Sequence, residues 1–236
     1  RVVEGNFGDL VDVVSGVTED PISGVLFDFG VSSHQLEQAG RGFSYRREGP
    51  LDMRMGPDAG LTAHEIVNEW PVEDIARIIR IYGEEPLARR IARAIVAARP
   101  IDSTATLSTV IADAMPAARR RAGHPARRTF QAIRIAVNGE LDAVASGVEQ
   151  AVDLVRTGGR VVAISYHSLE DRIVKQHFAE KARGCTCPPD LPVCGCGNTA
   201  EVRLLTRKPI RASEEEIAVN NRARSAVLRA VEKVAS

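Results

Sequence analysis

Two polar segments in this sequence directly follow apolar runs, and both could carry chemistry. The first is Asp28-Phe29-Gly30-Val31-Ser32-Ser33, and the second is Ser-Tyr-His-Ser-Leu-Glu-Asp-Arg at residues 165–172. Asp28 can accept hydrogen bonds from a cationic or hydroxylated ligand, or it can cap the turn that follows. His167 is placed to touch a substrate, although a single histidine is as often structural. The residue types leave a ligand site and a structural role open for both segments.

The second segment also holds the side chains from which hydrolases build catalytic triads. Ser165, His167, Ser168, Glu170 and Asp171 lie within one short stretch. Triad members normally converge from separate elements, and no Gly-x-Ser-x-Gly turn is present. The spacing therefore does not favour a hydrolase, which remains an alternative.

All cysteines lie in two C-x-C pairs, Cys185 with Cys187 and Cys194 with Cys196. Four thiolates can hold zinc tetrahedrally, although the usual spacing is C-x2-C. Unpaired thiols and disulfides are the alternatives, and disulfides require an oxidising compartment. A structural zinc site is thus one of three interpretations that the pattern leaves open.

The charges balance, with 31 basic and 31 acidic residues, which removes the simplest argument for a nucleic-acid partner. Their distribution is uneven, because residues 114–139 contain six arginines and no acid. Most charge runs are solvated helix faces, but an acid-free run can neutralise phosphates. We therefore predict an RNA contact through Arg119, Arg120, Arg121, Arg127, Arg128 and Arg134.

Strand and helix patterns alternate along the chain. Apolar runs at 24–30 and 160–166 predict buried strands, and shorter strand patterns occur at 202–206 and 226–231. Such alternation is typical of a doubly wound α/β sheet, whose ligands bind beyond the carboxyl ends of the strands. Both polar segments fall at such ends.

Residues 36–134 show helical spacing and no strand pattern. Thr62 and Glu65 form a capping-box signature, and Gly83, Pro100 and Pro116 end successive helices. We predict a helical insertion over 36–134 between two parts of one α/β domain, 1–35 and 135–236. A helical period continues from residue 130 to residue 155, and a further helix is predicted to be capped by Ser168 and Asp171.

Composition excludes a disordered tail, a fibrous repeat and a coiled coil. Apolar residues make up 44% and charged residues 26%, as in ordinary globular domains. No apolar run reaches the length of a membrane span, and no leader pattern is present. We expect a cytoplasmic protein without a membrane partner.

Blocks of sequence at 26–36, 41–44, 49–55, 82–85, 89–95, 124–132, 168–175 and 221–225 together resemble the RsmH (MraW) family of 16S ribosomal RNA cytosine-N4 methyltransferases. The resemblance implies a Rossmann-like, S-adenosylmethionine-dependent methyltransferase core with an inserted all-helical domain that helps recognise RNA. It implies N4-methylation of a cytidine in the decoding centre, on 16S rRNA or on the small ribosomal subunit.

The resemblance also implies site residues. Phe7, Asp28 and Gln35 match family positions that contact the methyl donor. Acceptors near the target amine would orient it, and the candidates are Asp28, Ser32, Ser33 and His167.

One departure from the family pattern concerns the beginning of the sequence. The family starts with a strand and a Gly-Gly-His-Ser type loop, followed by an acidic residue after its second strand, and this sequence has neither. We therefore expect a core that is incomplete at its N-terminus and binds the donor poorly. The alternative function is a non-catalytic RNA-binding fragment that lacks the donor-binding loop.

Overall fold

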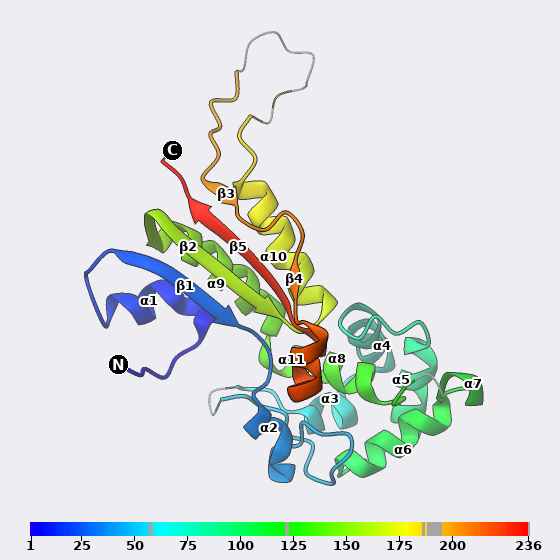
Figure 1. Ribbon diagram of the computed structural model, residues 1–236. Helices are drawn as coiled ribbons and strands as arrows, with labels where there is room; N and C mark the ends of the chain where they lie inside the picture. The colour runs from blue at the N-terminus through cyan, green and yellow to red at the C-terminus, as the bar shows by residue number, and fades with distance from the viewer. Residues whose placement is uncertain (57–58, 121–122, 186, 188–194, 236) are drawn as a thin grey trace. The chain divides into compact units, whose positions relative to one another are not determined.

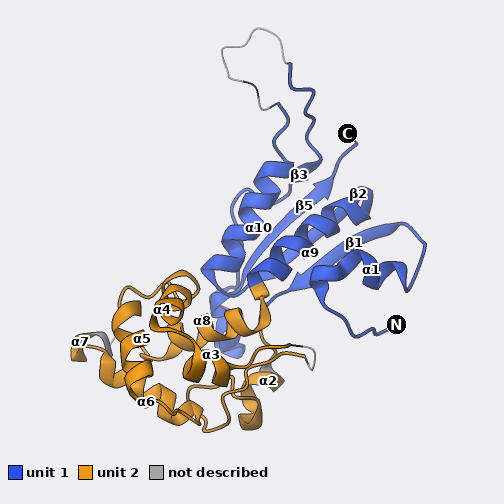
Figure 2. Cartoon of the chain, turned by 180° about the vertical axis from the view of Figure 1, so that it is seen from behind, with its two compact units in different colours: residues 1–30, 141–236 blue, residues 31–140 orange. Residues whose placement is uncertain are grey.

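The computed structural model describes residues 1–56, 59–120, 123–185, 187 and 195–235. The chain divides into two compact units (Figure 2). Residues 1–30 and 141–236 form the sheet unit, and residues 31–140 form the helical unit. The helical unit begins a few residues before, and ends a few residues after, the predicted insertion at 36–134.

The sheet unit is built on a mixed β-sheet (Figure 1). The strand order is β1-β2-β5-β3, and β4 pairs with β5 beside this path. Strand β1 runs parallel to β2, whereas β5 is antiparallel to β2, β3 and β4. The bounds are β1 (Ile22–Asp28), β2 (Val155–Ser165), β3 (Val202–Leu204), β4 (Ile210–Arg211) and β5 (Val227–Lys233). The α/β class is as predicted from the sequence, but the described sheet is parallel only between β1 and β2.

The register of β1 and β2 brings the two polar segments to one edge of the sheet. Asp28 is paired with Ile164, and the Phe29 amide donates to the Ile164 carbonyl at 3.0 Å. Because parallel strands end at the same edge, the residues that follow Asp28 and Ser165 start side by side.

Helices cover one face of this sheet. Figures 1 and 2 show α9 (Glu140–Leu154) and α10 (Ser168–Lys181) on the same side of the strands. Residues of α9 at helical spacing pack with α10 and with the buried face of the sheet, because an amphipathic helix buries one stripe. This core includes Val144, Val148, Val152, Val174, Phe178, Phe27, Val161 and Val231. Helix α1 (Leu10–Ser15) and a short 3-10 turn, η1 (Phe7–Asp9), precede β1.

The helical unit is built around isoleucines. Its helices are α2 (Ser33–Glu37), α3 (Ala63–Glu69), α4 (Val72–Ile81), α5 (Ala88–Ala97), α6 (Thr104–Ala114), α7 (Ala117–Arg120) and α8 (Arg127–Asn138), with a 3-10 turn, η2 (Ala39–Arg41). Ile66, Ile79, Ile91 and Ile133 are fully buried in one cluster. The predicted capping box is confirmed, since the Glu65 amide donates to Thr62 Oγ1 at 3.2 Å and the Thr62 amide donates to Glu65 Oε2 at 2.7 Å.

The continuous helical period at 130–155 predicted no break, and this was wrong. Helix α8 ends at Asn138, and Gly139 adopts a left-handed conformation with φ of 58°. Glycine favours this conformation because it has no Cβ. Helix α9 then starts nearly in phase with α8, so the apolar period passes over the break.

After β4, helix α11 (Glu214–Val219) and a 3-10 turn, η3 (Asn221–Ser225), lead into β5. Ser213 caps α11, and its Oγ accepts from the Glu216 amide at 3.2 Å. Within the described part of the chain, no helix is both long enough and apolar enough to cross a membrane.

Candidate functional site

Asp28 and Tyr166 meet at the edge of the sheet where β1 and β2 end. The Tyr166 hydroxyl donates to Asp28 Oδ1 at 2.8 Å. Burial, together with this hydrogen bond, raises the pKa of Tyr166 to about 12. The phenol therefore stays protonated at neutral pH and holds the Asp28 carboxylate, which is exposed. Helix α2, the next along the chain, is capped by Ser32, so Asp28 does not have the capping role that the sequence left open.

His167 and Glu170 form the N-terminal cap of α10. The Glu170 amide donates to His167 Nδ1 at 3.4 Å, and Glu170 Oε2 accepts from the amides of Tyr166 at 2.8 Å and His167 at 3.2 Å. The predicted cap by Ser168 and Asp171 was therefore wrong by one residue. Histidine is not among the usual capping residues, so the sequence rules passed over it.

The imidazole of His167 is already placed by this cap. Its Nε2 lies 3.0 Å from Glu170 Oε1, close enough for an ion pair when the ring is protonated. Nε2 makes no hydrogen bond within the described part of the chain, so its contact with Glu170 Oε1 is close but does not have the geometry of a hydrogen bond. The geometry therefore gives His167 a structural role at the strand end.

The side chains of the hydrolase alternative do not assemble into a triad. Asp171 accepts two hydrogen bonds from Arg229, at 2.6 Å from Nε and 3.0 Å from a terminal nitrogen. Ser165 is only 1% exposed. Because His167 pairs with Glu170 instead, Ser165, His167 and Asp171 do not form a catalytic triad.

Phe7 packs near the same strand end. Its ring centroid lies 5.4 Å from that of Phe29 and 6.1 Å from that of Phe27. Phe7 remains 36% exposed. This aromatic surface and the exposed Asp28 carboxylate both belong to the sheet unit.

Ser32, Ser33 and Gln35 belong to the helical unit at the start of α2. The Ser32 amide donates to Gln35 Oε1 at 2.9 Å, and the Gln35 amide donates to Ser32 Oγ at 3.2 Å. Both side chains therefore stabilise the helix end in this structure. The side chain of Ser33 lies outside the described residues.

The arginines predicted to contact RNA are in unlike environments. Arg134 makes two 2.8 Å hydrogen bonds to Glu140, and its side chain is 15% exposed. Arg127 and Arg128 are both exposed, and Arg128 donates to the Glu84 carbonyl at 3.0 Å. Residue 121 and the side chains of Arg119 and Arg120 lie outside the described residues.

A second group of arginines was not singled out by the sequence. Arg77 and Arg80 on α4, with Arg89 and Arg93 on α5, line a hollow of about 680 Å³. The signal was present, because residues 88–97 contain three arginines and no acid. It was overlooked because these helices were identified by their apolar spacing alone.

Three of the four cysteines lie close together. The Sγ atoms of Cys185, Cys187 and Cys196 are within 4.8 Å of one another, and those of Cys185 and Cys196 are 3.7 Å apart. The Gly195 amide holds the pKa of the Cys187 thiol below its usual value. Cys194 lies outside the described residues.

Comparison with known proteins supports the resemblance found from the sequence blocks. The protein named ribosomal RNA small subunit methyltransferase H of Symbiobacterium thermophilum is 56% identical over 237 residues, which are 99% of this chain and 74% of that relative. The proteins of the same name from Brevibacillus brevis and Heliobacterium mobile are each 54% identical, with 99% of this chain and 76% of each relative covered. Residues 1–234 match the MraW methylase family. This chain therefore belongs to the MraW methylase family.

Proposed function

We propose that this protein methylates N4 of a cytidine in the decoding centre of 16S rRNA and takes the methyl group from S-adenosylmethionine. The observation that carries the proposal is the family match over residues 1–234, together with relatives named ribosomal RNA small subunit methyltransferases. The choice of base and position rests on the resemblance described from the sequence blocks.

The strand-end residues fit a methyl donor that carries an adenine ring, ribose hydroxyls and a cationic sulfur. Phe7 offers a partly exposed ring, and Asp28 offers an exposed carboxylate. When bound, the donor supplies an activated methyl group on a sulfonium. An aromatic ring can stack on a base, and a carboxylate can accept hydroxyl hydrogens or face a cation.

The same carboxylate can serve the acceptor. The lone pair of a cytosine N4 is delocalised into its ring, so this amine is a weak nucleophile that needs alignment. Asp28 can accept an N4 hydrogen and hold the amine in one orientation, because Tyr166 fixes the carboxylate. The base has to be presented outside a stack for this contact.

The test is transfer of a labelled methyl group to small ribosomal subunits from cells that lack the enzyme. The expected result is label in the cytidine fraction after digestion of the RNA. RNA binding without any transferred label would contradict the proposal and support the non-catalytic RNA-binding alternative. Calorimetric titration with S-adenosylmethionine measures donor binding separately.

We also propose a zinc ion bound by Cys185, Cys187, Cys196 and Cys194. Tetrahedral thiolates with Zn–S bonds of about 2.3 Å have their sulfurs about 3.8 Å apart. The 3.7 Å separation of Cys185 and Cys196 supports such a site. Metal analysis of protein purified without a chelator should give about one zinc per chain, and Cys196→Ser should lower this value. A wild-type protein without zinc would contradict the proposal.

A further inference from the structure

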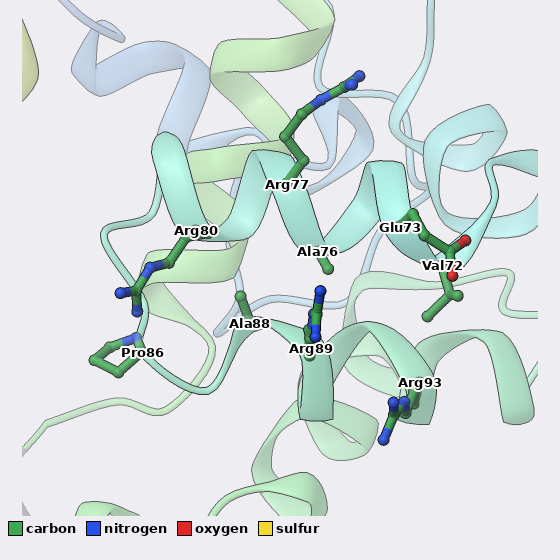
Figure 3. A pocket seen from close by; sticks show the side chains of 9 residues that line it. All are labelled: Val72, Glu73, Ala76, Arg77, Arg80, Pro86, Ala88, Arg89 and Arg93. Carbon is green, nitrogen blue, oxygen red and sulfur yellow. The ribbon is translucent and has the colours of Figure 1, made fainter.

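The hollow between α4 and α5, here called the arginine groove, belongs wholly to the helical unit. Figure 3 shows Ala76 of α4 facing Ala88 of α5, and these small side chains leave space that longer ones would fill. Arg80, Arg89 and Arg93 stand along this space. The groove is thus a hollow between two helices that is lined by arginine side chains.

The described residues that line the groove carry a net positive charge. Glu73 is the one acid among the described residues that line it. Arg77 is held by Asp74, with 3.0 Å between the charged atoms. Within the part of the chain that the structure describes, Arg80, Arg89 and Arg93 have no ion pair or side-chain hydrogen bond, and all three are exposed. Three guanidinium groups are therefore available to an anion.

The placement of these arginines is unfavourable for the fold alone. Arg89 and Arg93 are four residues apart on α5, so like charges repel along one face of the helix. Arg89 and Arg90 occupy the first turn of α5, where the helix dipole disfavours cations and favours anions. A bound anion would relieve both effects, whereas an empty groove leaves them in place.

We propose that the arginine groove binds the phosphate backbone of the RNA substrate, an inference that rests on the proposed function and deepens it. Arginine forks match phosphate oxygens in pairs. The described lining holds no aromatic residue on which a base could stack or around which a protein partner could anchor. Backbone contact of this kind positions RNA without reading its sequence.

The experiment compares RNA binding by the whole chain and by the triple variant Arg80→Gln/Arg89→Gln/Arg93→Gln. The probe is small-subunit ribosomal RNA, titrated at several salt concentrations. The triple variant should bind roughly ten-fold more weakly at low salt. The slope of log affinity against log salt should fall by about 2, since each lost phosphate contact removes about 0.7 for single strands.

Two further variants keep the result interpretable. Arg90→Gln removes an exposed arginine of the same helix that does not line the groove, so it should leave affinity nearly unchanged. Glu73→Gln removes the acid of the groove and should tighten binding two- to five-fold at low salt. Thermal melting checks that all variants fold alike.

The outcomes separate this inference from the proposed function. In methyl transfer to small subunits, the triple variant should raise KM for RNA and leave kcat nearly unchanged. If the triple variant binds RNA with the affinity and salt slope of the wild type, the proposed role of the groove is wrong, even if the wild type methylates RNA. Conversely, if the triple variant binds RNA more weakly and the wild type transfers no methyl group, the groove's role in RNA binding is supported and the proposed reaction is rejected. If the triple variant bound RNA as the wild type does but lost binding to an acidic protein partner, the proposal would also be overturned.

Discussion

The strand end of the sheet unit and the arginine groove of the helical unit differ in whether their polar and charged side chains have partners within the protein. At the strand end, Tyr166 donates to Asp28, Arg229 binds Asp171, and Glu170 accepts two backbone amides. In the groove, Arg80, Arg89 and Arg93 have no such partner among the described residues. At the strand end these polar groups are bound to other groups of the same unit, whereas the three arginines of the groove are open to a ligand.

This difference separates residues that position from residues that bind. A buried charge without a partner is costly, so the ions beneath the strand end must be paired for the unit to fold. Exposed arginines carry almost no such requirement, and their loss should affect binding alone. Stability and binding measurements on matched variants can therefore test the comparison.

The largest expected effect is on stability, from Arg229→Met. Arg229 is 9% exposed and makes both hydrogen bonds to Asp171, so its removal leaves the carboxylate of Asp171, whose side chain is 23% exposed, without this partner. We expect a loss of about 3 kcal/mol in the free energy of unfolding. Urea unfolding measures it, with Arg89→Met as the exposed control, which should change by less than about 0.5 kcal/mol. Equal effects in the two variants would break the comparison.

The next effect is on catalysis, from Asp28→Ala. If this carboxylate orients the acceptor and contacts the donor, methyl transfer should fall about 100-fold or more, or about 2.7 kcal/mol. Tyr166→Phe keeps the carboxylate and removes only the hydroxyl that holds it, so its loss should be about ten-fold or less. Single-turnover transfer measures both variants. Unchanged turnover in Asp28→Ala would remove this residue from the site.

A smaller effect, on stability, is expected at His167. The imidazole caps α10, so His167→Ala should cost about 1 kcal/mol, whereas His167→Asn restores a capping acceptor and most of the stability. Methyl transfer by His167→Asn should stay close to that of the wild type. An inactive but stable His167→Asn variant would instead show that the imidazole acts in the reaction.

The last effect is confined to alkaline pH and arises at Tyr166. Because the folded-state pKa is raised to about 12 from a usual 10, the unfolded chain loses this proton first. The contribution is fully present below about pH 10 and is lost as the pH rises towards 12. Unfolding free energy should fall less steeply over this range in Tyr166→Phe. An identical slope in wild type and variant would show that the phenol does not hold Asp28 in this way.

Local signals in the sequence predicted much of the fold. The ends of α4, α5 and α6 fall just before Gly83, Pro100 and Pro116, and the cap at Thr62 is as predicted. These rules work because glycine, proline and capping side chains act on backbone groups a few residues away. The cap of α10 was missed because an imidazole stands where a hydroxyl or carboxylate was expected.

The sequence also predicted part of the candidate site. Asp28 was singled out because it follows an apolar run, and the structure places it at the end of a strand. Tyr166 was not, since its link to Asp28 joins residues 138 positions apart. The sequence did not predict that Arg128 donates to a carbonyl 44 positions away, and its predicted RNA contact stays a prediction.

The sequence by itself determined the α/β class, the helical character of the inserted segment, the family blocks and several of the local helix ends. Only the tertiary structure decided which charges are paired, as between Asp171 and Arg229, and which are left open, as in the arginine groove. The physical reason is range. Caps and periodicity operate within a few residues of the chain, whereas an ion pair depends on packing that brings distant segments together.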